Sequence, residues 1–221
     1  GRYLPVLPAW RDAVTLRHLL HHTAGLPEVA VVDIGGRHWT TARALAALCD
    51  PAMSEPMPGV AELYSNTGYV CLGVVVEQVT GKPLARFIED EIIGPLVLGD
   101  MAIWDSEATP PYPQHLHMGP CLPLTVGDGG LWTAAPAFVG WLDSQNRDRL
   151  GIADLVQQPG RLATGALTNY GWGIGLREFR GQFVRALVGV LEVERVLELF
   201  FDLRQVADHL ALLGDRHRLI Q

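Results

Sequence analysis

The stretch between Tyr64 and Gly81 constrains the fold of this chain more than any other. Tyr64 and Asn66 stand two residues apart with a glycine close behind, a spacing that suits a tight turn directing both side chains into one cavity. Over residues 69–79, apolar side chains occupy almost every side of a helix, which Gly81 ends. The sequence therefore predicts a buried helix with two polar candidate residues at its entrance.

Tyr64 and Asn66 have side chains suited to acyl transfer. A phenol can move a proton, and a carboxamide can orient the amide or ester group of a substrate. A free phenol has a pKa of about 10, so Tyr64 serves as a base near neutral pH only where neighbouring cations favour the phenolate. Ser65 has the right hydroxyl for a nucleophile but no base in a recognised arrangement, so we predict that it is a turn residue.

Composition narrows the class of protein. The chain has 221 residues, of which 48% are hydrophobic and 19% charged, so one large or two small domains with a sizeable core are expected. A net charge of −7 without a basic run disfavours nucleic-acid binding. No stretch approaches the roughly 20 apolar residues of a membrane span. The chain opens at Gly1 without a methionine or a signal peptide and carries no indication of localisation or oligomeric state.

The sequence predicts no metal and no other cofactor. The three cysteines are scattered without ligand spacing, so they are expected to be free, buried thiols. Adjacent histidines on a helix point to different faces, so His21 and His22 are expected to cap or pack the following turn. The two loop histidines lack a third ligand and are expected at the surface. The residues weighed as metal ligands are Cys49, Cys71, Cys121, His21, His22, His115 and His117.

Local signals predict several further elements. Capping residues and prolines begin the helices, and glycines end them. Residues 51–60 and 105–128 are rich in proline and are expected to be loops, whereas residues 170–176 alternate large side chains with glycine as a closely packed strand does. The helices are expected from Thr15 to about Leu20, from Thr40 or Thr41 to about Cys49, from Pro83 through Ile92 to an end at Gly94-Pro95, and after Gly130 through Trp141.

Four ordered stretches together resemble the serine β-lactamase/penicillin-binding-protein superfamily, in its class C-like branch, which also holds esterases and D-amino-acid peptidases. The resemblance covers roughly residues 3–180, and its specificity comes from the order of the motifs, since one alone would be weak. The stretches are residues 14–27 (VTLRHLLHHTAGLP), 64–81 (YSNTGYVCLGVVVEQVTG), 129–134 (GGLWTA) and 170–173 (YGWG).

The resemblance assigns roles to Tyr64 and Asn66 and also exposes two missing elements. It implies Tyr64 as general base and Asn66 as the residue that holds the substrate amide. The family's Ser-x-x-Lys lies several tens of residues before a stretch like 14–27, so this chain starts too late to contain it. The family's late Lys-Thr-Gly or His-x-Gly strand is also unmatched, because His117-Met118-Gly119 precedes Gly129-Gly130 and is out of order. None of the serines, Ser54, Ser65, Ser106 and Ser144, has a lysine three residues later.

The implied function is that of a bacterial serine hydrolase that cleaves a small-molecule ester, amide or lactam through an acyl-enzyme. The alternative is a non-catalytic, truncated homologue or binding module that lacks the nucleophile. The implied fold is a helix-rich, partial β-lactamase/transpeptidase-like α+β fold with few antiparallel strands.

The expected domain boundary falls near Phe183. Residues 1–182 form the β-lactamase-like region, mostly its helical lobe with the start of the sheet lobe. Residues 183–221 form a divergent tail, predicted helical because apolar residues recur there at helical spacing between charged ones. We hypothesise that this tail departs from the family's course, which translation of the other reading frames near codon 183 would test.

Overall fold

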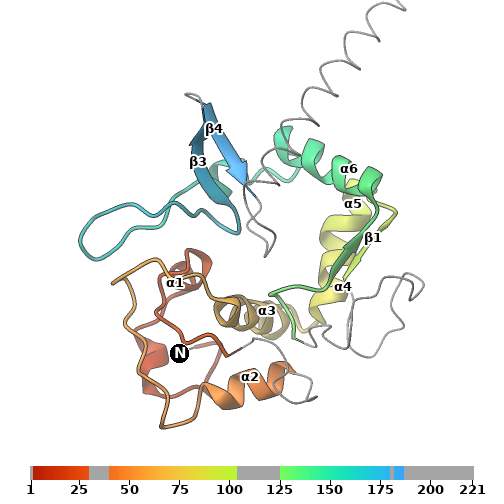
Figure 1. Ribbon diagram of the computed structural model, residues 1–221. Coiled ribbons are helices and arrows are strands. Elements are labelled where there is room, and N and C mark those ends of the chain that lie inside the picture. The colour runs from red at the N-terminus through yellow and green to blue at the C-terminus, as the bar shows by residue number, and fades with distance from the viewer. Residues whose placement is uncertain (1, 30–39, 104–124, 180–181, 187–221) are drawn as a thin grey trace, which may run out of the picture. The chain divides into compact units, whose positions relative to one another are not determined.

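The chain divides into two compact units, Gly1–Gly173 and Ile174–Gln221. Figure 1 shows the helices and strands of both units. The computed structural model describes residues 2–29, 40–103, 125–179 and 182–186. The second unit contributes an antiparallel hairpin of β3 (Gly175–Phe179) and β4 (Gln182–Ala186), in which Arg177 lies opposite Val184.

Helices dominate the first unit. Its two short strands, β1 (Met101–Ile103) and β2 (Leu131–Thr133), pair antiparallel with Ala102 opposite Trp132. The prediction of a helix-rich α+β fold with few antiparallel strands is confirmed. The helical elements are η1 (Ala9–Asp12), α1 (Leu16–Leu20), α2 (Thr41–Ala47), α3 (Asn66–Thr80), α4 (Leu84–Ile88), the π-helical turn η2 (Glu89–Ile93), α5 (Gly94–Leu96), α6 (Ala135–Asn146) and α7 (Ala153–Val156).

The predicted helix boundaries follow the capping chemistry closely. The Thr15 hydroxyl accepts the His18 amide at 3.2 Å and begins α1, and the Thr40 hydroxyl accepts the Arg43 amide at 3.3 Å and begins α2. Gly81 takes a left-handed φ of 68° and ends α3, because glycine has no side chain to oppose that conformation. These local signals need no tertiary partner, which is why the sequence reveals them.

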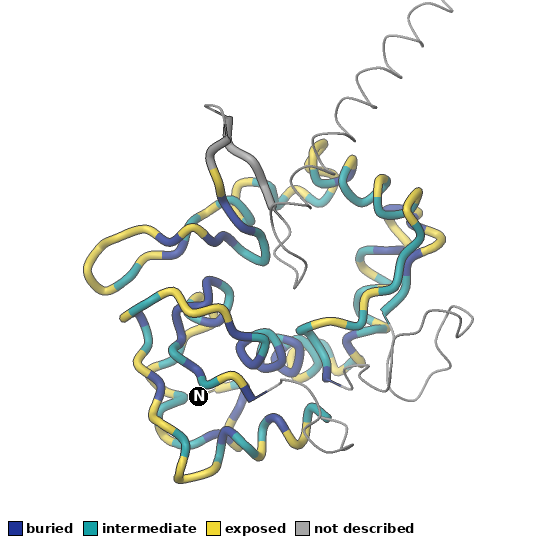
Figure 2. Tube along the Cα trace, in the orientation of Figure 1, coloured by how far each residue is buried: buried dark blue, intermediate teal, exposed yellow. Residues whose placement is uncertain are grey.

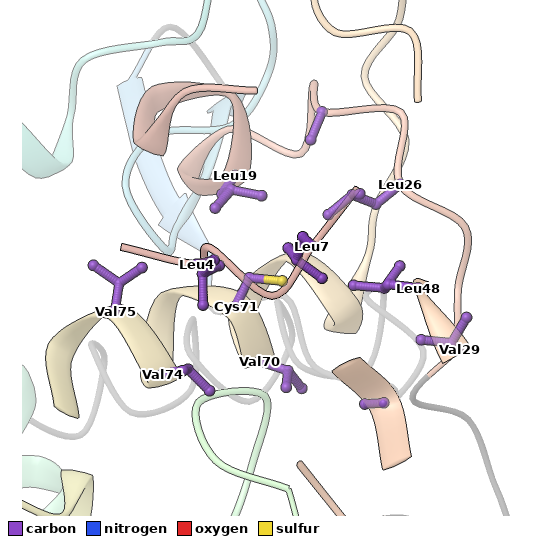
Figure 3. Close-up of a cluster of buried hydrophobic side chains, with 12 residues drawn as sticks. Leu4, Leu7, Leu19, Leu26, Val29, Leu48, Val70, Cys71, Val74 and Val75 are labelled. Atoms are coloured by element: carbon purple, nitrogen blue, oxygen red, sulfur yellow. The ribbon is translucent and has the colours of Figure 1, made fainter. Parts of the chain in front are cut away.

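Helix α3 lies at the centre of the larger hydrophobic cluster. Val70, Val74 and Val75 are buried on this helix, and Figure 2 shows buried residues along its first and middle turns. Figure 3 shows α3 side chains meeting leucines of the N-terminal segment and of α1. The buried members of the cluster are Leu4, Leu7, Leu19, Ala24, Leu26, Val29, Ala44, Leu48, Val70, Cys71, Val74 and Val75. Among the described residues, no helix has the length and apolar character needed to cross a membrane.

The helix that begins after Pro83 extends beyond its predicted end. It does not stop at Gly94-Pro95, because α4 continues through η2 into α5 and ends only at Val97, where φ is 59°. A π-helical turn widens the backbone, and Pro95 lies in the first turn of the next helix, where a proline is tolerated. This segment supplies the second cluster of buried residues, Ile93, Leu96, Leu98 and Met101.

The strand predictions need two corrections. Tyr170 forms only an isolated β-bridge, residues 171–174 are irregular, and β3 begins at Gly175. The helical prediction from Phe183 onward is wrong for residues 183–186, which belong to β4 because they pair with β3. Residues 187–221, and residues 105–124 of the predicted long loop, lie outside the described residues. The domain boundary near Phe183 stays a prediction.

The loop at residues 125–128 packs closely against α3. The Val126 amide donates to the Thr41 hydroxyl at 3.1 Å, which ties the loop to α2. Gly127 has a φ of 93°, and a Cβ atom there would lie 2.3 Å from the carbonyl oxygen of Tyr69. The contact therefore requires glycine, and it places Asp128 beside the beginning of α3.

We expect Gly127→Ala to lower the free energy of unfolding by about 3 kcal/mol, because the methyl group adds a backbone clash to left-handed strain. Gly81→Ala is the matched control: Gly81 has a φ of 68° but no atom within 4 Å of the added Cβ, so we expect a loss of only about 1 kcal/mol. Urea unfolding followed by circular dichroism measures both. Equal losses in the two variants would contradict the close approach of the loop to α3.

Candidate active site

Tyr64 and Asn66 flank the beginning of α3. Asn66 is the first residue of the helix, and Tyr64 stands two residues earlier on the segment that leads into it. The predicted tight turn is wrong in form, because Ser65 between them is extended, with φ −147° and ψ 115°. The phenol of Tyr64 is 48% exposed, and Asn66 is partly buried. Both residues therefore sit at the accessible end of an otherwise buried helix.

Ser65 caps α3 and is buried. Its hydroxyl oxygen accepts the Gly68 amide at 3.3 Å, which satisfies one of the amides that a helix N-terminus leaves without an intrahelical partner. The side chain is only 5% exposed. This capping bond gives Ser65 a structural role, in line with its predicted place as a turn residue and not as a nucleophile.

We expect Ser65→Ala to lower the free energy of unfolding by about 1 kcal/mol, the usual loss for a serine N-cap. Ser54→Ala is the control, because Ser54 is exposed in the loop before the site and should change stability little. Chemical denaturation of the two variants beside the parent chain provides the measurement. A Ser65→Ala variant as stable as the parent would show that the capping bond contributes nothing.

Two carboxylates border the phenol of Tyr64. Glu28 accepts the Asn66 amide at 2.7 Å and the Thr67 hydroxyl at 3.5 Å, so it complements the positive end of the α3 dipole. Asp128 accepts the Thr125 hydroxyl at 2.7 Å, and burial raises its pKa. Burial, Glu28 and Asp128 together raise the pKa of Tyr64. The phenol is therefore protonated at neutral pH, where it can donate a proton but cannot accept one.

A buried histidine pair lies behind Tyr64. His21 and His22 follow α1 and are 1% and 2% exposed. The Nδ1 atom of His21 lies 3.0 Å from the carbonyl oxygen of Tyr170, and the Nδ1 atom of His22 accepts the Ser65 amide at 3.1 Å. The His21 amide also donates to the carbonyl oxygen of Arg17, and this hydrogen bond caps the C-terminus of α1. The expected placement of both residues on a helix is wrong, because α1 ends at Leu20, but both side chains are buried and packed as expected.

Three tyrosines surround the His22 ring. Its centroid lies 4.4 Å from that of Tyr64, 5.0 Å from that of Tyr69 and 4.4 Å from that of Tyr170. The Tyr69 hydroxyl donates to the Leu20 carbonyl oxygen at 3.0 Å and is also hydrogen-bonded to the Tyr170 hydroxyl. Burial raises the pKa of Tyr170 to about 12 and raises that of Tyr69 as well. The cluster is consequently uncharged near neutral pH.

We expect the pH dependence of stability to report on His22. Burial, followed by the neighbouring His21, lowers the pKa of His22 from about 6.5 to about 4, and burial also lowers the pKa of His21. The folded chain binds fewer protons than the unfolded chain, so this stabilisation is present above about pH 6.5 and is lost as the pH falls toward 4. Melting temperatures between pH 7.5 and 4.5 provide the measurement.

His22→Asn is the control for this pH dependence, because asparagine does not titrate. The stability advantage of the parent chain over His22→Asn should shrink as the pH falls. A constant difference between the two proteins from pH 7.5 to pH 4.5 would contradict a buried, neutral His22.

Sequence reasoning identified Tyr64 and Asn66 but missed the residues that surround them. Glu28, Asp128 and Tyr170 come from three distant segments, and only Tyr170 carried a signal, as part of the YGWG motif. Within the described residues, no group of three or more histidine, cysteine or acidic side chains could hold a metal ion. His115 and His117 lie outside the described residues, as does His117-Met118-Gly119.

Two cavities among the described residues lie away from Tyr64 and Asn66. One, of about 210 Å³, is lined by apolar side chains that include Leu7, Trp10 and Leu19. The other, of about 240 Å³, is lined by loop residues that include Pro51 and Met53. Tyr64 and Asn66 line neither cavity, so their accessible position at the beginning of α3 defines the candidate site.

A helix-rich α+β chain that carries a Tyr-x-Asn pair agrees with what the resemblance to β-lactamases and transpeptidases implies. Comparison with protein families supports that class directly, because the beta-lactamase family model matches residues 1–189. The chain belongs to the beta-lactamase family.

Curated relatives match part of this chain. A penicillin-binding protein of Bacillus subtilis (strain 168) is 32% identical over 125 residues, which are 53% of this chain and 27% of that protein. A putative D-alanyl-D-alanine carboxypeptidase of Salmonella schwarzengrund (strain CVM19633) is 29% identical over 92 residues, which are 40% of this chain and 21% of that protein. The chain thus spans about a quarter of the length of these curated relatives.

Solved structures share the fold. The D-amino acid amidase from Ochrobactrum anthropi SV3 superposes with a TM-score of 0.64 at 21% identity, over 84% of this chain and 61% of that chain. A penicillin-binding protein from Bacillus halodurans gives a TM-score of 0.60 at 21% identity, over 81% and 63% of the two chains. At these identities the likeness establishes the fold and not the substrate.

Proposed function

We propose that this chain provides the tyrosine and asparagine of a serine hydrolase site that cleaves an ester, amide or lactam through an acyl-enzyme. The observation that carries the proposal is the placement of Tyr64 and Asn66 at the accessible beginning of α3, in a chain of the beta-lactamase family. Asn66 orients the carbonyl or amide group of a small-molecule substrate, and Tyr64 handles the proton. No cofactor takes part in this scheme.

The proposed reaction has two halves. In the first, a serine oxygen bonds to the substrate carbonyl carbon, the bond to the leaving group breaks, and the serine proton passes through the Tyr64 oxygen to the leaving group. In the second, water adds to the acyl ester, the serine–acyl bond breaks, and the proton of the water returns to the serine. The scheme requires a serine nucleophile with a nearby lysine, as a Ser-x-x-Lys encoded upstream of Gly1 would supply.

The electrostatics of Tyr64 make a cation part of the proposal. Burial and the carboxylates of Glu28 and Asp128 raise the pKa of the phenol, which is opposite to what a general base needs. A lysine ammonium close to the phenol oxygen would reverse this balance and favour the phenolate. The lysine of an upstream Ser-x-x-Lys would supply that charge together with the nucleophile.

The second candidate function is that of a binding module without catalysis. It is favoured by the serines of the chain, since Ser54, Ser65, Ser106 and Ser144 all lack a lysine three residues later. In this case the raised pKa of Tyr64 is the working state, and the neutral phenol and Asn66 hold a ligand through hydrogen bonds. Translation of the gene upstream of Gly1 discriminates between the two functions, because only the hydrolase requires a Ser-x-x-Lys there.

We expect the 221-residue chain to form no acyl-enzyme with a fluorescent penicillin or with p-nitrophenyl acetate, because it lacks the Ser-x-x-Lys nucleophile. A longer product that contains an upstream Ser-x-x-Lys should be acylated at that serine. Tyr64→Phe should slow its acylation by about 100-fold or more, the usual contribution of a positioned proton carrier. Intact-mass spectrometry and peptide mapping follow the labelling.

Ser65→Ala provides the matched control for the labelling. Stoichiometric acylation of the 221-residue chain that disappears in Ser65→Ala would identify Ser65 as the nucleophile and overturn the proposed source of the serine. An upstream sequence without Ser-x-x-Lys would overturn the hydrolase proposal in favour of the binding module.

A further inference from the structure

Tyr64 is held on both sides by a single distant residue. The Leu63 amide donates to the carbonyl oxygen of His22 at 2.7 Å, and the Ser65 amide donates to the His22 Nδ1 atom at 3.1 Å. The main chain and the side chain of His22 thus bind the two amides that flank Tyr64. Because both bonds begin at the same residue, the backbone of Tyr64 has little freedom to rotate relative to α1.

The His22 ring also supports the phenol ring of Tyr64. The two ring centroids lie 4.4 Å apart with an interplanar angle of 38°, and the Tyr170 ring contacts the imidazole edge-on, at 4.4 Å and 64°. His22 is 2% exposed whereas Tyr64 is 48% exposed. The buried His22 ring therefore packs against a half-exposed phenol ring, and this contact restricts the directions open to the hydroxyl group.

His22 carries local costs that packing alone leaves unexplained. Its φ of 56° lies in the left-handed region, which costs a residue with a side chain roughly 1 kcal/mol or more. Since Nδ1 accepts the Ser65 amide, the ring proton resides on Nε2, which is buried and has no hydrogen-bond partner among the described residues. A strained backbone and an unpaired buried donor persist only where other interactions of the same residue hold them in place. For His22, these interactions include the hydrogen bonds to the Leu63 and Ser65 amides and the ring contact with Tyr64.

We infer that His22 is the positioning residue of Tyr64, which fixes the backbone through the two flanking amides and the phenol through ring contact. The inference rests on the proposed function, in which Tyr64 carries the proton. His22 itself touches Tyr64 and not the reacting atoms, so it is not a catalytic residue. Only an imidazole with a free lone pair on Nδ1 can accept the Ser65 amide, so this role belongs to the neutral ring.

Two substitutions separate the two parts of this role. His22→Phe keeps an aromatic ring but removes the acceptor, and His22→Asn keeps an acceptor near the position of Nδ1 but removes the ring. His21→Asn is the matched control, because His21 is equally buried and bonds to the Tyr170 carbonyl, not to an amide beside Tyr64. Melting temperatures should fall in all of these variants.

Two measurements test the role of His22. They are the NMR chemical shift of the Tyr64 ring and the protection of the flanking backbone amides from hydrogen exchange. In the 221-residue chain labelled with 13C-tyrosine and 15N, the signal lost in Tyr64→Phe identifies the Tyr64 ring. We expect His22→Phe to raise the hydrogen-exchange rate of the Ser65 amide by about tenfold or more, as expected for loss of one buried hydrogen bond. His22→Asn should largely restore that protection while the Tyr64 ring signal moves toward that of an exposed tyrosine.

His21→Asn should leave both the Tyr64 signal and Ser65 exchange at the parent values. If His22→Phe and His22→Asn lower the melting temperature but leave both at parent values, His22 only packs and the inference is overturned. Where neither variant folds, the parent chain decides, since the absence of nuclear Overhauser contacts between the His22 and Tyr64 rings would overturn it as well. None of these measurements requires acylation, so a failure of the hydrolase proposal remains distinguishable.

Discussion

The burial of α3 is the constraint on which the rest of the described structure depends. Valines and a cysteine on this helix meet the N-terminal segment, α1 and α2, and the loop at Gly127 closes against its backbone. A helix enclosed in this way cannot slide or rotate without breaking several contacts at once. The first turn of α3 is therefore held in place, and the side chains at its beginning have defined positions.

The sequence predicted those parts of the structure that depend on neighbouring residues. Thr15 and Gly81 act within one turn of their own helices, so the beginning of α1 and the end of α3 could be read from local chemistry. The cap at Ser65 was not predicted, and α3 begins at Asn66, three residues before the predicted helical stretch from residue 69. The pair Tyr64 and Asn66 was equally visible, because its spacing belongs to a single motif. The resemblance to the beta-lactamase family rested on the order of such motifs, and the family comparison bears it out.

The sequence did not predict the contacts that join distant segments. The bond between Glu28 and the Asn66 amide spans 38 residues, and the bond between the Ser65 amide and His22 spans 43. In the sequence alone, Glu28 looks like any carboxylate in a loop, and His22 looks like any histidine in a core. The prediction of a helix from Phe183 was wrong for a related reason. Apolar residues recur there at helical spacing, but residues 182–186 pair with β3 and form a strand.

These long-range contacts change the chemical meaning of the motif. Read alone, Tyr64 is a candidate base, but its surroundings are two carboxylates, a buried neutral imidazole and two phenols whose pKa values are raised. Such an environment holds the phenol in place while favouring its protonated form. Geometry and protonation are therefore controlled separately, the first by His22 and Ser65 within this chain, the second by the sign of the charge that approaches the phenol. A single ammonium group near the phenol would convert Tyr64 from a proton donor into a base without moving any residue at the beginning of α3.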